Sequence, residues 1–116
     1  MSDVVIYHNP ACGTSRNTLA LLREQGVEPK VVEYLKAGWT AAQLEGLIKT
    51  LGVPARDVLR VMGTQAEALG LTKPGATDAQ LISAMVKDPI LVNRPIVVTA
   101  KGAALCRPAE QALALL

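Results

Sequence analysis

Residues 4–18 read VVIYHNPACGTSRNT, an apolar run followed by an Asn-Pro break and a set of small polar residues. The apolar run is typical of a buried strand, and the polar residues after the break are typical of a helix start. This order brings Cys12 to the N-terminal end of the helix. There the helix dipole, free backbone N–H groups, His8 and Arg16 are all expected to lower the pKa of the thiol. We therefore predict a nucleophilic cysteine at neutral pH, at a helix start that also attracts an oxyanion.

The neighbouring sequence extends this start into an α/β domain. Strands are expected over residues 3–7 and 30–35, and between them a helix over residues 15–25 that ends before Gly26. A strand, a helix and a strand with short joints form a right-handed parallel unit. Such folds bind ligands at the sheet edge where the first strand ends, and Cys12 follows directly after that edge.

A helical insertion is expected next. Its apolar periodicity predicts helices over residues 40–51, 55–61 and 77–86, separated by proline and glycine. The two longer helices each start with the spacing of a capping box, in Thr40 with Gln43 and in Thr77 with Gln80.

The sequence after the insertion predicts a β-hairpin between two Arg-Pro pairs. Its strands are IVVT and AALC, it turns near residues 101–102, and a closing helix follows it. If the hairpin runs antiparallel to the first strand, Arg94 at its entry and Arg107 at its exit both return to the Cys12 end of the sheet. Each arginine precedes a proline, which holds its backbone extended. Neither arginine has an adjacent Asp or Glu in the sequence, so we expect the pair to bind an anionic substrate.

The composition indicates one domain. The chain has 116 residues, of which 50% are hydrophobic, and this is enough for a single core over residues 1–116. A net charge of +2 and an aromatic content of 3% argue against binding of nucleic acid. The N-terminus MSDVVIYH lacks the features of a signal peptide, and no apolar stretch approaches membrane-spanning length. We therefore expect a cytoplasmic protein with no membrane partner.

Cysteine and histidine usage narrows the chemistry further. The two cysteines, Cys12 and Cys106, lie far apart in the sequence, which fits a reduced compartment better than a disulfide framework. Cys106 ends a predicted strand beside Leu105, and we interpret it as a small buried hydrophobic residue. Because His8 is the only histidine, the chain has no Cys/His spacing for zinc, and we expect no metal site.

Some polar residues have two interpretations that the residues alone leave open. His8 either tunes the thiol or is a strand-end residue satisfied by backbone groups. Arg60 either binds the anion or forms an i,i+3 pair with Asp57 on a solvated helix face. Thr14 and Ser15 are first of all candidate helix caps, and any role in holding the thiolate is secondary.

The spacing around Cys12 excludes one thiol chemistry and disfavours another. Ser15 stands where a dithiol oxidoreductase carries its second cysteine, so no internal CxxC disulfide can form. Arg16 lies four residues after Cys12, whereas the tyrosine-phosphatase loop has a five-residue spacing. The thiol must therefore act alone or together with an external thiol.

Three motifs of the chain resemble those of the glutaredoxin-coupled arsenate reductases: YHNPACGTSRNT near the start, VNRPIVVT late in the chain and LCRP near its end. The resemblance spans essentially the whole chain. The cysteine loop combined with the hairpin between two Arg-Pro pairs makes it specific. It implies an α/β thioredoxin-like fold, with a mixed four-stranded sheet and a helical insertion.

Carried over residue by residue, the resemblance also implies roles. Cys12 is the nucleophile, and His8 is the neighbour that tunes it. The oxyanion-binding residues are Arg60, Arg94 and Arg107, and we place Ser15 with them in the substrate site. Pro95 is expected to follow a cis peptide bond.

The implied reaction is the reduction of arsenate to arsenite by the single cysteine, with glutathione and glutaredoxin as electron donors. Glutathione is then a co-substrate, and the protein binds no metal and no organic cofactor.

Two rival functions remain. A related branch of the fold binds RNA polymerase as a redox-sensing regulator, but that branch typically carries CxxC, which Ser15 precludes. A glutathione-dependent oxidoreductase for protein mixed disulfides would need Cys12, yet it has no use for three converging arginines.

Overall fold

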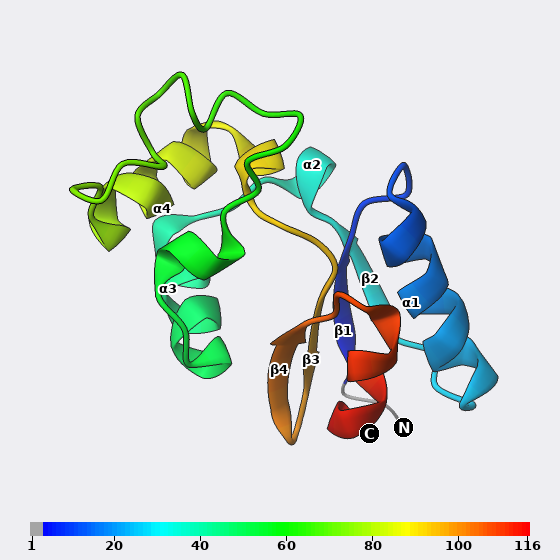
Figure 1. Cartoon of the computed structure of the whole chain (residues 1–116). Helices are drawn as coiled ribbons and strands as arrows, with labels where there is room; N and C mark the ends of the chain where they lie inside the picture. The colour runs from blue at the N-terminus through cyan, green and yellow to red at the C-terminus, as the bar shows by residue number, and fades with distance from the viewer. Residues whose placement is uncertain (1–3) are drawn as a thin grey trace. The chain divides into compact units, whose positions relative to one another are not determined.

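The computed structural model describes residues 4–116 and contains a four-stranded mixed sheet with helices (Figure 1). In chain order the elements, with η for 3₁₀ helices, are β1 (Val5–His8), α1 (Gly13–Glu24), β2 (Lys30–Glu33), α2 (Tyr34–Ala37), α3 (Ala41–Leu51), η1 (Ala55–Val58), α4 (Asp78–Lys87), η2 (Pro89–Leu91), β3 (Ile96–Thr99), β4 (Gly102–Leu105) and η3 (Ala109–Leu115). The residues group into two compact units: the chain up to Ala37 together with Arg94–Leu116, and Gly38–Asn93.

The sheet lies in the first unit and has the strand order β2-β1-β3-β4. β1 pairs with β2 in parallel and with β3 antiparallel, and β3 and β4 form the expected hairpin. Tyr7 lies opposite Ile96, and Ile96 lies opposite Leu105. The start of β3 and the end of β4 therefore meet the end of β1. The hairpin geometry expected from the sequence is confirmed, and it returns Arg94 and Arg107 to the edge where Cys12 follows β1.

One face of this sheet packs against α1 and η3, which contact each other (Figure 1). Alternate residues of a strand share a face, and Ile6 and His8 of β1 are accordingly both buried. The buried cluster on this side consists of Val4, Ile6, Leu22, Val97, Cys106 and Ala112. Through Leu22, near the C-terminal end of α1, this cluster holds the helix against the sheet.

The second unit is the expected helical insertion. Thr40 and Thr77 form the predicted capping boxes at the starts of α3 and α4, and each accepts a hydrogen bond from the backbone N–H three residues later. Both predictions are confirmed. Its buried core includes Leu44, Leu47, Ile48, Val58, Leu81, Met85 and Leu91.

The structure corrects several expected boundaries. The last strand was expected over AALC but runs over Gly102–Leu105 and ends before Cys106. The second strand was expected to run to residue 35 but ends at Glu33, because a helical turn begins at Tyr34 and buries its side chain. The segment 55–61 is helical only to Val58, because Leu59 then forms an isolated β-bridge with Val92.

The closing helix and the first helix also differ from expectation. The closing helix is a 3₁₀ helix, η3, and not an α-helix. α1 begins at Gly13 and not at residue 15, and Gly26 lies just beyond its end in the left-handed conformation that was expected there. For the first strand, which was expected over residues 3–7, position 3 lies outside the described residues, and β1 extends to His8.

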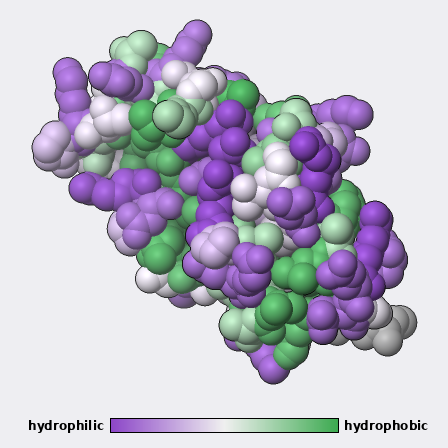
Figure 2. Space-filling model, turned by 45° about the vertical axis from the view of Figure 1, so that its right-hand side comes forward, coloured by the Kyte–Doolittle hydropathy of each residue, from purple (hydrophilic) through white to green (hydrophobic). Residues whose placement is uncertain are grey.

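The face drawn in Figure 2 carries hydrophilic and hydrophobic residues in interspersed small patches. The large apolar side chains that are exposed are Val31, Leu35, Val61, Met62, Leu69 and Leu113. Within residues 4–116, no helix is both long enough and apolar enough to span a bilayer.

Candidate active site

Cys12 is the N-cap residue of α1, at the end of a tight turn that follows β1. The turn is closed by a hydrogen bond from the Cys12 N–H to the Asn9 carbonyl at 3.0 Å. The Asn9 side chain accepts from the Ala11 N–H at 3.0 Å, and Arg16 Nη1 donates to the Pro10 carbonyl at 2.9 Å. Three local hydrogen bonds thus hold the thiol at the helix start.

The two hairpin arginines meet at this thiol. Arg107 Nη1 lies 3.8 Å from Cys12 Sγ and also donates to the Arg94 carbonyl at 3.0 Å. The positive charge of Arg94 also acts on the thiol. Both arginines precede cis peptide bonds, so the expected cis bond at Pro95 is confirmed and a second one, at Pro108, was not expected.

Ionisation of Cys12 is opposed by burial and favoured by its contacts. Burial alone would raise its pKa. The backbone N–H of Ser15, the Arg107 side chain, the charge of Arg94 and the Thr14 N–H act in the other direction, and the net pKa of Cys12 is lowered. This is the behaviour expected of a reactive cysteine at a helix start, where N–H groups and cations favour the thiolate.

Two groups that were expected to lower this pKa act elsewhere. His8 does not contact the thiol: its Nδ1 lies 2.6 Å from Ser15 Oγ. Burial lowers the pKa of His8 itself, Glu33 opposes this, and Arg16 and Arg23 add to the lowering. His8 is therefore neutral at pH 7 and supplies no positive charge. Arg16 braces the turn through Pro10 and is not among the groups that shift the thiol.

Ser15 is not the helix cap that its position suggested. Its hydroxyl accepts a hydrogen bond from the Asn9 N–H at 3.0 Å. The same hydroxyl oxygen lies 2.6 Å from His8 Nδ1, and the tautomer of the imidazole decides which of the two groups donates. Ser15 is fully buried and ties β1, the turn and α1 together behind the thiol.

Arg60 lies in the insertion, among residues 38–93. Its Nε donates to the Met62 carbonyl at 3.0 Å, and its backbone N–H donates to the Leu91 carbonyl at 2.8 Å. Among the described residues it forms no ion pair with Asp57. The structure thus brings together Cys12, Arg94 and Arg107. Ser15 contacts Cys12 through its backbone N–H, and His8 contacts Ser15. Arg60 is described within its own unit.

The second cysteine has a different environment. Cys106 is fully buried in the cluster behind β1 and β4, and burial raises its pKa to about 11. Its interpretation as a buried hydrophobic residue is confirmed. Both cysteines are free.

Asn9 is the site residue that the sequence analysis did not single out. Its side chain is buried and holds the turn before Cys12. Asn directly before Pro is a turn signal, and a backbone N–H that donates to the side-chain oxygen of the residue two positions earlier forms the usual Asx turn. The signal was therefore present in the sequence.

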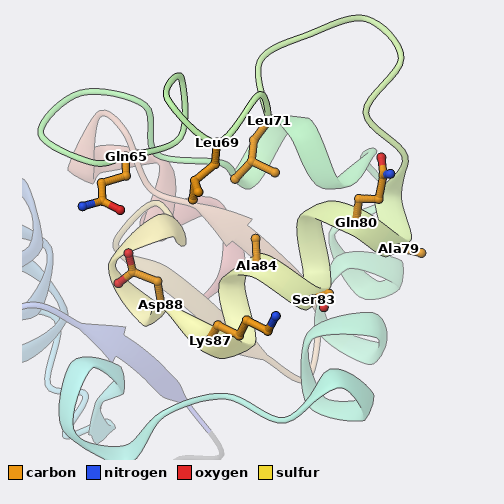
Figure 3. A pocket seen from close by; sticks show the side chains of 9 residues that line it. All are labelled: Gln65, Leu69, Leu71, Ala79, Gln80, Ser83, Ala84, Lys87 and Asp88. Carbon is orange, nitrogen blue, oxygen red and sulfur yellow. The ribbon is translucent and has the colours of Figure 1, made fainter.

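Away from Cys12, the described residues present fewer groups that could react or bind a metal. Among residues 4–116, no three His, Cys, Asp or Glu side chains gather in a way that could hold a metal ion. A groove of about 530 Å³ lies in the insertion (Figure 3), between Leu69 and Leu71 on one side and Ala84 and Lys87 of α4 on the other. None of its lining residues is a cysteine or histidine.

The fold and the site together define a thioredoxin-like α/β protein with a single thiol at the start of its first helix. A model of the ArsC family matches residues 7–115, and the chain belongs to this family. Curated relatives named arsenate reductase include one from Rhizobium meliloti, 52% identical over 113 residues, which are 97% of this chain and 81% of that protein. One from Escherichia coli K12 is 49% identical over 116 residues, 100% of this chain and 82% of the relative. A solved arsenate reductase from Vibrio cholerae has a TM-score of 0.93 at 41% identity and 97% coverage of both chains.

Proposed function

We propose that this protein reduces arsenate to arsenite, with Cys12 as its only reacting thiol and with glutathione and glutaredoxin as electron donors. One observation carries the proposal: a cysteine of lowered pKa at a helix start, with Arg107 Nη1 3.8 Å from its sulfur and the charge of Arg94 acting on it. The names of the relatives support arsenate as the substrate.

Binding comes first. Arg94, Arg107 and the N–H groups at the start of α1 offset the charge of the oxyanion and orient arsenic for attack by the thiolate. Arg60 is assigned to the same anion through the family resemblance. Phosphate has the same charge and nearly the same shape, so we expect it to act as a weak competitor.

In the redox step, the Cys12 thiolate attacks arsenic(V) and forms a sulfur–arsenic bond. One arsenate hydroxyl takes up a proton from solvent and leaves as water. A glutathione thiolate attacks the Cys12 sulfur; a disulfide forms, the sulfur–arsenic bond breaks, and its electron pair reduces arsenic to arsenic(III), which leaves as arsenite. Glutaredoxin then removes the glutathionyl group by thiol–disulfide exchange and regenerates Cys12. No step uses a metal or an organic cofactor. We propose a cytoplasmic location for this activity, because it needs reduced glutathione and a thiol that stays reduced.

The test is a coupled assay with arsenate, glutathione, glutaredoxin and glutathione reductase, which follows NADPH consumption. Cys12→Ser is expected to abolish turnover and to leave oxyanion binding intact. The matched control is Cys106→Ala, which removes the other thiol from the core and is expected to keep turnover. Glutathione-dependent turnover by Cys12→Ser would refute the nucleophile assignment.

A further inference from the structure

A groove of about 430 Å³ lies between α1 and η3, and we call it the α1–η3 groove. Its lining includes Thr14 and Asn17 of α1 and Pro108 and Glu110 of the C-terminal segment. Thr14 donates its N–H to the Cys12 thiol, and Pro108 directly follows the arginine that contacts the same sulfur. Cys12 itself is not part of the lining, but one end of the groove is formed by residues that lie next to the reacting atom.

The charges beside the thiol and inside the groove have opposite signs. The Arg107 guanidinium lies beside the thiol, next to the groove and outside its lining. Away from the thiol, the ionisable groups in the lining are the carboxylates of Glu110 and Glu24, and Asn17 adds an amide. Such a groove suits a thiol compound that has a carboxylate near the sulfur and an ammonium group one residue away from it.

The other grooves fit less well. A neighbouring groove of about 680 Å³ shares Ala20 and Glu24 of α1 with the α1–η3 groove and contains Arg16 and Arg23. Arg16 already donates to Pro10, Arg23 pairs with Glu28, and neither arginine acts on the Cys12 thiol. The two grooves of the insertion include no residue of the cysteine loop.

We propose that the α1–η3 groove is the glutathione subsite, an assignment that rests on the proposed function. The cysteine of glutathione faces Cys12, its glycyl carboxylate lies toward Arg107, and its γ-glutamyl ammonium group is held by Glu110, with Asn17 beside it.

The length of glutathione favours Glu110 over Glu24 as the partner of its ammonium group. An extended residue spans about 3.5 Å, so the γ-glutamyl ammonium group lies roughly 7–8 Å from the central residue of glutathione. Glu24 is ten residues from Thr14 in α1, about 15 Å along the helix axis at 1.5 Å per residue. Glu110 is two residues from Pro108, at most about 7 Å along the chain, which corresponds to that reach. Glu24 closes the far end of the groove and makes no contact with the ligand.

The subsite is tested by a reaction that needs no arsenate. When glutathione disulfide is added, the Cys12 thiolate attacks one of its sulfurs, a new disulfide forms, and one glutathione thiolate leaves. The rate constant is followed by the mass gain of the protein. We compare wild type, Glu110→Gln and the matched control Glu24→Gln, each with glutathione disulfide and with the uncharged 2-hydroxyethyl disulfide.

We expect Glu110→Gln to slow the reaction with glutathione disulfide about two- to fivefold, the size expected of one exposed ion pair. The rate constant of Glu110→Gln with the uncharged disulfide should equal that of wild type. Glu24→Gln should have the wild-type rate constant with both disulfides. In the coupled assay, Glu110→Gln should raise KM for glutathione and leave KM for arsenate unchanged.

The sign of the effect is decisive, because glutathione disulfide carries a net negative charge. If Glu110 merely repels it, removing the carboxylate speeds the reaction. A faster reaction, no change, or equal slowing with both disulfides overturns the subsite. A failure of the proposed function gives a different result from a failure of the subsite. In that case wild type reduces no arsenate, whatever the measured rates of disulfide exchange.

Discussion

At Cys12, burial and hydrogen bonding act on one thiol in opposite directions. The other buried sulfur, Cys106, stays protonated, because burial raises its pKa to about 11. The contrast between the two cysteines arises from their partners: one accepts N–H groups at a helix start and faces Arg107, and the other faces aliphatic side chains. Reactivity in this chain is therefore a property of position and not of residue type.

The first prediction concerns the pH dependence of this thiol. Alkylation follows the thiolate fraction, so a lowered pKa shifts the midpoint of the rate profile to lower pH. In the Cys106→Ala background, we expect iodoacetamide to react with native Cys12 at a lower midpoint pH than with the same thiol in denaturant. Arg107→Gln should move the native midpoint upward. Equal midpoints in the native and denatured states would contradict the assignment.

A second prediction at this scale concerns Ser15. Ser15→Ala removes the acceptor of the buried Asn9 N–H and the partner of His8 Nδ1. Leaving buried polar groups unpaired is expected to lower the free energy of unfolding by about 1–3 kcal/mol. Chemical denaturation measures the change, and Ser83→Ala, at an exposed position of α4, serves as the control with little effect. Equal stability of the two variants would disprove the role of Ser15.

At the scale of elements, the features that could be predicted are those that local sequence determines. A capping box needs a threonine and a glutamine three residues apart, and both boxes form as expected. The hairpin and its two Arg-Pro ends were likewise visible in a short stretch, and this was enough to predict the meeting of Arg94 and Arg107 at the thiol.

The features that were missed depend on tertiary packing. VVEYL is consistent with a strand throughout, but burial of Tyr34 ends β2 early. The segment after Pro54 has helical periodicity, but pairing of Leu59 with Val92 ends it after one turn. The contact of His8 with Ser15 needed the knowledge that β1 turns this histidine toward α1. In each case the deciding partner is distant in the sequence or on another element.

The cap of α4 gives a prediction at this scale. Thr77→Ala removes the side chain that accepts from the Gln80 N–H. We expect it to lower the free energy of unfolding by about 1 kcal/mol, the usual value of an N-cap. The comparison is Thr72→Ala, at an exposed threonine of the preceding loop, which should change the stability by less than about 0.5 kcal/mol. Similar losses of stability in both variants would show that the N-cap hydrogen bond does not cause the effect of Thr77→Ala.

At the scale of the whole molecule, the chain forms two compact units of roughly equal size, and the expectation of a single domain over residues 1–116 stays a prediction. Units of about this size bury too little surface to be more than marginally stable alone. We therefore expect them to unfold together.

Two local probes test this. Trp39 is the only tryptophan and is buried in the insertion, so its fluorescence reports on Gly38–Asn93. Cys106 is buried in the other unit, and in a Cys12→Ser background its reaction with a thiol reagent reports on that unit. We expect both probes to give the same denaturant midpoint. Two separate midpoints would show that the chain consists of two domains.

The end of β4 joins two neighbouring residues with opposite surroundings. Cys106 is enclosed in the aliphatic cluster, and the next residue, Arg107, reaches the thiol at the start of α1. Removing one residue in this short span would place the cation in the core, and adding one would place the second thiol at the anion site. Insertions and deletions should therefore be tolerated during evolution at the hairpin tip, residues 100–101. Selection should remove them between Leu105 and Pro108.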